Sequence, residues 1–247
     1  MIDEKIEQTI YRLLHPNDTL DVRLFDARKQ MHPDVRKILL DNSRYILAKT
    51  LGKIPGLEVD DIWLVGSSAS YFYHEKSDLD VRIVLRNDNC EWLTKDEDAL
   101  RQFLYSSFMG ILQSFRFNLY DRFVDVKLDC QHKDKRIYTG PYSILNDKWI
   151  NTPDKNLFAD LTFDGVLAAY QNKYRELTEY MENIQVSGAL QTRTGLKELE
   201  TLYVDMIKNC TSDPLTYIVF KLLVYTKVFS EMQNLYSTNM KNYLDIK

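Results

Sequence analysis

Residues 62–85 read Ile62-Trp63-Leu64-Val65-Gly66-Ser67-Ser68-Ala69-Ser70-Tyr71-Phe72-Tyr73-His74-Glu75-Lys76-Ser77-Asp78-Leu79-Asp80-Val81-Arg82-Ile83-Val84-Leu85, and they decide the fold. They predict a short buried strand, a Gly-Ser turn into a short helix, and a second strand that begins with two aspartates. Because side chains alternate between the faces of a strand, Asp78 and Asp80 point one way while Leu79 points into a core. The stretch therefore predicts two carboxylates side by side at the start of a strand.

Two neighbouring carboxylates repel each other unless a cation lies between them. Hard divalent ions such as Mg²⁺ take oxygen ligands, and they often bind through one or two carboxylates and the phosphates of a substrate. Asp78 and Asp80 are therefore a candidate metal site. Gly66 and Ser67 would bind the phosphates, because a glycine at a strand-to-helix turn lets backbone N–H groups approach an anion and the helix N-terminus attracts it.

This spacing resembles the signature of the polymerase-β-type nucleotidyltransferase superfamily. In that signature a Gly-Ser turn is followed, after about ten residues, by an Asp-x-Asp strand with apolar neighbours. Here the turn is Gly66-Ser67 and the strand begins with Ser77-Asp78-Leu79-Asp80-Val81. The resemblance implies that Asp78 and Asp80 are catalytic metal ligands, and that Gly66, Ser67, Ser68 and Ser77 lie around the bound nucleotide.

The same resemblance implies a third carboxylate on a neighbouring strand. Residues 124–129 alternate between apolar Val124, Val126 and Leu128 and polar Asp125, Lys127 and Asp129, which predicts a half-buried strand. Asp125 is the expected third ligand, with Asp129 and Asp121 as alternatives, and an exposed acidic strand residue is the other interpretation. Lys127 would either steady phosphate charge or pair with Asp129.

Further short segments narrow the resemblance to a group of nucleotidyltransferases common in bacteriophage genomes, over residues 20–235. The segments that carry it are His32-Pro33-Asp34-Val35-Arg36, Gly66-Ser67, Asp78-x-Asp80, Gly140-Pro141-Tyr142-Ser143, Trp149-Ile150 with Pro153, and Tyr217-Ile218-Val219-Phe220-Lys221. The resemblance implies a two-lobed enzyme that uses a nucleoside triphosphate in a bacterial cytoplasm, which is the host cytoplasm if a phage encodes it. The acceptor in that group is largely undefined.

The apolar pattern of the whole chain predicts an α+β fold, in which a small mixed β-sheet nucleotidyltransferase core flanked by helices precedes an all-helical C-terminal lobe. Helical spacing of apolar residues is found at 2–14, from Pro33 to about residue 52, and at 100–115, 160–184, 190–209 and 214–236. We place the catalytic domain with its N-terminal helices at residues 1–153 and the helical lobe at 154–247.

Composition limits the class of protein. The 247 residues carry a net charge of −4, so no global basic field holds nucleic acid, and we favour the addition of one or a few nucleotides to a compact acceptor. No run approaches the ~20 apolar residues of a membrane span, and no signal peptide is evident, so we expect a soluble cytoplasmic protein. Cys90, Cys130 and Cys210 are widely spaced and odd in number, which favours free thiols.

The chemistry that the resemblance implies is metal-dependent nucleotidyl transfer with Mg²⁺ or Mn²⁺. Two ions ~3.5–4 Å apart would bind the attacking and leaving oxygens of an in-line displacement at the α-phosphate. Asp78 and Asp80 would ligate both ions, Asp125 would ligate the ion at the attacking hydroxyl, and pyrophosphate would leave toward the Gly-Ser turn. Lys221 would contact the triphosphate, or it is a solvated helix lysine.

Three classes of function remain open from the sequence. The first is an active transferase whose acceptor is an RNA 3′ end, a nucleotide or a protein hydroxyl. The second is a catalytically weak nucleotide-binding regulatory or antitoxin-like module, and the third is a structural phage component. An arginine or lysine that fills the gap between the carboxylates, or an Asp125 that points away from the other two, would overturn this account of the site.

Overall fold

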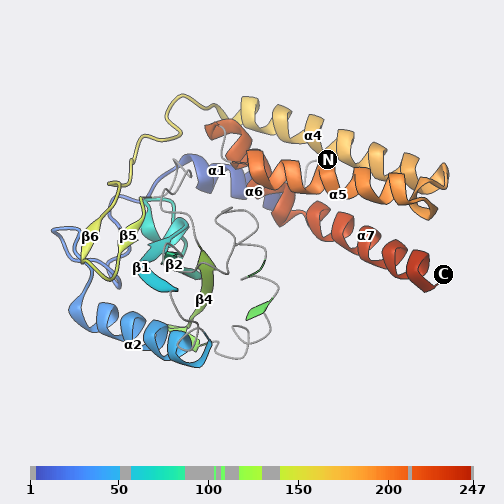
Figure 1. Cartoon of the computed structure of the whole chain (residues 1–247). Coiled ribbons are helices and arrows are strands. Elements are labelled where there is room, and N and C mark those ends of the chain that lie inside the picture. The colour runs from blue at the N-terminus through green and yellow to red at the C-terminus, as the bar shows by residue number, and fades with distance from the viewer. Residues whose placement is uncertain are drawn as a thin grey trace. The chain divides into compact units, whose positions relative to one another are not determined.

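The computed structural model describes residues 4–50, 57–86, 103, 107–108, 117–129, 140–210 and 213–245. The chain divides into two compact units (Figure 1). We call Pro16–Lys155 the sheet unit, and Met1–His15 together with Asn156–Lys247 the helical unit. The division falls close to the expected boundary at residue 153, but it groups the first helix with the C-terminal helices rather than with the sheet.

The described strands of the sheet unit form one mixed sheet in the order β3-β4-β2-β1-β5-β6. Their bounds are β1 Glu58–Val65, β2 Leu79–Arg86, β3 Phe117–Leu119, β4 Arg122–Asp129, β5 Tyr142–Ser143 and β6 Lys148–Trp149. β1 and β2 are antiparallel, whereas β2 and β4 are parallel. The predicted α+β class and mixed sheet are thus confirmed, and the sheet places the strand of Asp80 directly beside the strand of Asp125.

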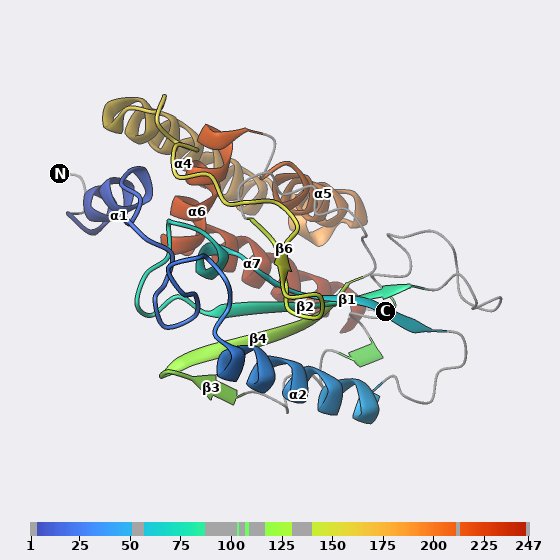
Figure 2. The same cartoon turned by 90° about the vertical axis from the view of Figure 1, so that its left-hand side faces the viewer.

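One face of this sheet forms the core. Helix α2 (Pro33–Thr50) begins with a proline, whose missing N–H costs nothing at a helix start. The helix runs along the sheet in Figure 2. Its buried side chains, including Val35, Leu39 and Ile46, join those of the three central strands in a single apolar cluster. Strands β2 and β4 contribute alternate residues to this cluster, which are Leu79, Val81, Ile83 and Leu85 of β2 and Val124, Val126 and Leu128 of β4.

The other face of the sheet carries the polar residues of the same strands. In the register of β2 and β4, Asp80 lies opposite Asp125, Arg82 opposite Lys127, and Val84 opposite Asp129. Alternation therefore places Asp80, Arg82, Asp125 and Lys127 on the face opposite the main core, as the sequence predicts. This face also holds a smaller buried apolar cluster of Trp63, Val65 and Val84.

The helical unit contains α1 (Glu4–Leu14), α4 (Phe163–Val186), α5 (Arg193–Asn209), α6 (Pro214–Tyr225) and α7 (Val228–Asp245). Threonine side chains cap two of these helices: Thr162 accepts a hydrogen bond from the N–H of Gly165, and Thr192 accepts one from Gly195. Since capping hydroxyls favour helix starts at those positions, α4 and α5 each begin later than the predicted 160 and 190. No described helix has the length and apolar composition that crossing a membrane requires.

The predicted single helix at 214–236 is wrong. The structure has two helices there, α6 and α7, because the chain turns between Tyr225 and Val228. Lys227 has a φ of 65°, a left-handed conformation that an α-helix cannot continue through. The helix predicted at 100–115 falls almost wholly outside the described residues.

Candidate functional site

The candidate site is built at the ends of β1, β2 and β4 nearest the Gly-Ser turn. Asp80 is the register partner of Asp125 on the neighbouring parallel strand and of Val65 on β1. Because register partners in a sheet present their side chains to the same face, Asp80 and Asp125 are neighbours on the polar face. Their side chains are about one-third exposed, at 36% and 33%. Both carboxylates therefore combine a fixed backbone with access to solvent.

Gly66, at the end of β1, packs directly against Asp80. Its backbone has φ 79° and ψ −163°, a region that is essentially restricted to glycine. A Cβ atom at this position would lie 2.5 Å from Asp80 Oδ2, closer than any side chain can be placed. The glycine is thus required twice, once by its dihedral angles and once by the carboxylate beside it.

Asp78 precedes β2 and is electrostatically coupled to the other two carboxylates. Partial burial raises the pKa of the Asp78 carboxyl, and the negative charges of Asp80 and Asp125 raise it further, although Arg122 and Lys127 oppose the rise. The rise has burial as its largest cause, and the two neighbouring carboxylates add to it, so Asp78 lies close enough to Asp80 and Asp125 to feel their charges.

Lys127 lies among these carboxylates. Its Nζ is 2.6 Å from Asp125 Oδ2 and 3.8 Å from Asp80 Oδ1. Of the two alternatives for Lys127, pairing with Asp129 is wrong, because Lys127 pairs with Asp125 while Asp129 is buried and ion-paired with Arg82 at 2.5 Å. The structure thus contains the basic side chain that we expected to be absent between the carboxylates, and Lys127 supplies a positive charge where a metal ion was predicted.

A metal ion fits the chemistry of this site but not its present arrangement. The donors are carboxylate oxygens, which Mg²⁺ and Mn²⁺ prefer. However, within the described part of the chain no group of three or more His, Cys, Asp or Glu side chains is arranged to hold an ion. The Lys127 side chain is 46% exposed, so it has room to turn away from Asp80 and Asp125.

The structure distinguishes the three candidates for the third carboxylate. Asp125 faces Asp80, whereas Asp129 is 4% exposed and paired with Arg82. Asp121 lies in the turn that joins β3 to β4, with a φ of 58°. Such a position suits aspartate in a two-residue hairpin turn but lies off the strand face. Asp125 is therefore the candidate that the geometry favours.

The serines around the turn differ in their environments. Ser67 begins a single 3-10 turn of three residues, so the predicted helix with its anion-attracting N-terminus is much shorter than expected. Ser68 is fully buried, and its hydroxyl donates a hydrogen bond to the carbonyl of Asp78 at 2.5 Å. Ser77 accepts a hydrogen bond from the N–H of His74. Ser68 and Ser77 are therefore engaged within the protein, and Ser67 is the serine best placed for a ligand.

Lys221 belongs to α6 of the helical unit. Its ammonium lies 5.5 Å from the centre of the Tyr217 ring, a distance at which a cation is attracted to an aromatic face. The predicted role of Lys221 at the triphosphate stays a prediction.

The chain was compared with protein-family models, with curated proteins and with solved structures, and none of them matches it significantly. The interpretation of the site therefore depends on its own residues.

The sequence interpretation missed Asp21 and Arg122. Arg122 is 2% exposed and forms an ion pair with Asp21, which is 1% exposed. The alternation of β4 contains a signal that would have found Arg122, because position 122 shares its face with the apolar Val124 and Val126. A charged residue on a core face needs a buried partner, although the pattern does not say which residue that is.

Proposed function

We propose that this protein transfers a nucleoside monophosphate from a nucleoside triphosphate to a hydroxyl acceptor, with release of pyrophosphate and with Mg²⁺ or Mn²⁺ as cofactor. One observation carries the proposal: the Asp80 carboxylate packs against Gly66, whose backbone conformation is essentially restricted to glycine, and faces the carboxylate of Asp125 on the neighbouring strand. A purely structural sheet gains nothing from three acidic groups that repel one another, whereas a phosphoryl-transfer site uses them.

Each residue of the site has a part in the proposed reaction. Asp78, Asp80 and Asp125 would hold the metal, which when bound neutralises charge on the phosphates and on the attacking oxygen. Gly66 lets the chain approach the triphosphate without a side chain in the way. The N–H groups at the start of the 3-10 turn have no acceptor within that turn, so they are suited to an anion. Asp125 is suited to accept the proton of the attacking hydroxyl.

Lys127 must leave its present position for this reaction. Its long side chain pairs with Asp125 and Asp80 in the structure, where it offsets their mutual repulsion. With a cation held by these carboxylates, the Lys127 ammonium would be repelled and would be available to the phosphates, which a lysine binds as a point charge.

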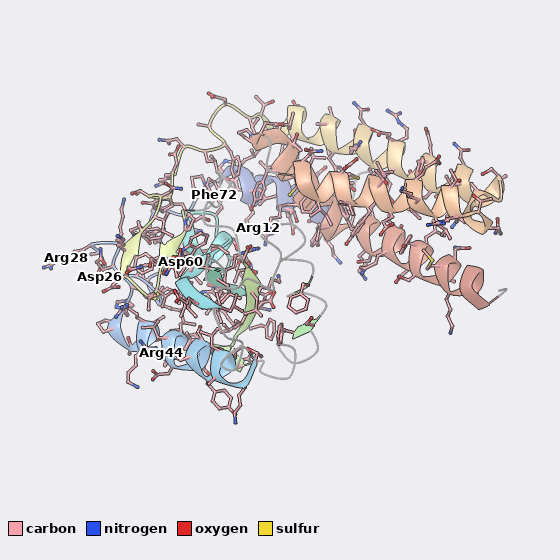
Figure 3. The ribbon with its side chains drawn as sticks, viewed as in Figure 1. Arg12, Asp26, Arg28, Arg44, Asp60 and Phe72 are labelled. Atoms are coloured by element: carbon pink, nitrogen blue, oxygen red, sulfur yellow. The ribbon has the colours of Figure 1, made fainter. Side chains whose placement is uncertain are left out.

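The direct test is incubation of the protein with each labelled nucleoside triphosphate, Mg²⁺ or Mn²⁺, and RNA, nucleotide or protein acceptors. We expect metal-dependent incorporation that falls at least about 100-fold in Asp78→Asn and Asp80→Asn, since each removes a charge needed in the transition state. The matched control is Asp60→Asn. Asp60 lies on β1 (Figure 3), and its partner Arg86 is at the opposite end of β2 from Asp80. If Asp60→Asn were as inactive as Asp80→Asn, or if the wild type incorporated no nucleotide, the proposal would be wrong.

A second candidate is a nucleotide-binding module with weak or no catalysis, of a regulatory or antitoxin-like kind. The observation that favours it is the Lys127 ammonium at Asp80 and Asp125. In such a module the ammonium would take the place of the metal ion permanently. In that case the wild type would bind nucleoside triphosphate without metal and without turnover. Calorimetric titration with a triphosphate in the presence of EDTA distinguishes the two candidates.

A further inference from the structure

Arg122 is the largest fully buried side chain in the described structure, and it stands at the start of β4. Burying a guanidinium is unfavourable unless each donor finds an acceptor. Arg122 meets this need with three different partners. Its Nε donates to the carbonyl of Ser77 at 2.5 Å, its Nη1 to the carboxylate of Asp21, and its Nη2 to the hydroxyl of Ser68.

Two of these three contacts lead to Asp78. The Ser77 carbonyl belongs to the peptide that joins Ser77 to Asp78. Ser68, which accepts from Arg122, donates its own hydroxyl hydrogen to the carbonyl of Asp78 at 2.5 Å. Arg122 therefore holds the peptide groups on both sides of Asp78, one directly and one through Ser68. Asp78 lies just before β2, where the sheet ladder itself does not fix it.

The third contact fixes Arg122 in turn. Asp21 accepts hydrogen bonds from Arg122 and also from Arg23, whose Nε and Nη2 bind the carboxylate at 2.9 and 2.8 Å. A two-point Arg–carboxylate pair fixes the plane of the carboxylate as well as its position. These residues form a series in which each one fixes the next. Arg23 fixes Asp21, Asp21 fixes Arg122, and Arg122 fixes Asp78 through Ser68.

We infer that Arg122 is a positioning residue that, with Ser68, sets the place of Asp78 in the site. The inference rests on the proposed function for its consequence, because a displaced Asp78 would weaken the binding of a divalent ion. Mutation of residues that orient a metal-binding side chain without touching the metal typically lowers metal affinity ~10–100-fold.

Ser68→Ala is the variant that tests this inference, because Arg122→Ala would remove the largest fully buried side chain of the described structure and one of the two cations that bind Asp21, and would endanger folding. Ser68→Ala removes one hydroxyl and breaks the connection from Arg122 to the Asp78 carbonyl, while the direct bond from Arg122 to the Ser77 carbonyl stays. The matched control is Ser70→Ala. Ser70 lies in the same turn, is also buried, and donates to the carbonyl of Ser67 rather than to that of Asp78.

The first measurement is hydrogen exchange of residues 77–80 in the metal-free protein, which needs no assumption about function. We expect exchange there to become about fivefold faster in Ser68→Ala, as the loss of one hydrogen bond allows, and to be unchanged in Ser70→Ala. Equal effects of the two variants, or no effect of Ser68→Ala, would overturn the inference.

The second measurement is Mn²⁺ binding by electron paramagnetic resonance, in a double-mutant cycle with Asp78→Asn. We expect Ser68→Ala to weaken Mn²⁺ binding about tenfold when Asp78 is present and not at all when it is Asn. An equal loss in both backgrounds would overturn the inference, since Ser68 would then act without Asp78. Faster exchange at residues 77–80 in a protein that binds no Mn²⁺ would support the positioning of Asp78 and reject the proposed function.

Discussion

The smallest feature that the site depends on is the missing side chain of Gly66. We predict that Gly66→Ala lowers nucleotidyl transfer at least about 100-fold, because its Cβ would collide with the Asp80 carboxylate 2.5 Å away. The strained backbone costs a further ~1–3 kcal/mol of stability. Incorporation of labelled nucleotide and thermal unfolding measure the two effects.

Gly188→Ala is the control for this substitution. Gly188 also has a positive φ, 72°, but it lies in the helical unit and its Cβ would meet only the end of the Gln191 side chain. Gly188→Ala should therefore lose stability and keep its activity. Equal losses of activity in the two variants would show that backbone strain alone, and not contact with Asp80, accounts for the effect of Gly66→Ala.

Replacing Lys127 should strengthen metal binding, whereas the substitution of Gly66 should weaken the function of the site. Because its ammonium occupies the place of a cation, Lys127→Met should bind Mn²⁺ about two- to fivefold more tightly than the wild type, as expected for removal of partly exposed ion pairs. Electron paramagnetic resonance titration measures the affinity. Lys37→Met is the control, since Lys37 pairs only with Asp41 on the exposed side of α2. Weaker Mn²⁺ binding by Lys127→Met would show that the lysine does not compete with the ion.

At the scale of elements, Asp21 ties the segment before α2 to the start of β4. Burial alone would raise the pKa of Asp21, but hydrogen bonds from Arg23 and the charges of Arg122 and Arg23 lower it below its ordinary value of 3.8. A lowered pKa means that the ionised carboxylate stabilises the folded state. This contribution is complete above pH 3.8 and is lost as the pH falls through the folded-state pKa.

We therefore predict that Asp21→Asn lowers the free energy of unfolding by ~3–5 kcal/mol at pH 7, because Arg122 is left buried without its counter-charge. Urea unfolding at pH 7 and in steps below pH 4 measures this difference. The gap between wild type and variant should shrink in the acid range. A gap that is constant with pH would mean that the charge of Asp21 does not contribute.

The apolar face of the sheet could be predicted from the sequence, because it follows from the two-residue period of strands. The facing of Asp80 and Asp125 was expected only from the family resemblance, and the parallel register of β2 and β4 shows it. Pairing between distant segments does not follow from any period. For this reason Asp21 and Arg122, 101 residues apart along the chain, were missed. Pairing of Lys127 with Asp129 was one expected alternative because the two residues share a strand face two positions apart. The sequence does not show that Arg82, on the neighbouring strand β2, binds Asp129 instead.

Helix ends were predicted less well than helix interiors for a related reason. The apolar stripe of residues 214–236 continues through the turn at Lys227, so the stripe does not mark where α6 ends. The left-handed conformation of Lys227 ends this helix locally, and the Thr226 side chain donates hydrogen bonds to the carbonyls of Leu222 and Leu223 at that end. Periodicity reports which face is buried, whereas such local contacts decide where an element stops.

At the scale of the whole molecule, the two units have separate cores. Ile10 of α1 is fully buried, and α1 contacts α4 and α6. We predict that Ile10→Ala destabilises the helical unit by ~2–5 kcal/mol, seen as faster hydrogen exchange in α4 and α6, with β1 and β2 unchanged. Leu39 lies in the core of the sheet unit. Leu39→Ala should therefore make hydrogen exchange faster in β1 and β2 and leave it unchanged in α4 and α6. Faster exchange in both units in either variant would contradict the division.

The helical unit is discontinuous in sequence, since α1 precedes the sheet unit and α4 to α7 follow it. During synthesis on the ribosome, residues 16–155 emerge before the segments that α1 packs against. The sheet unit has all it needs for its core at that moment and can fold first, as domains commonly do on the ribosome. The apolar stripe of α1 stays unburied until α4 and α6 have been synthesised. During that interval we expect α1 to be the part of the nascent chain most in need of a chaperone.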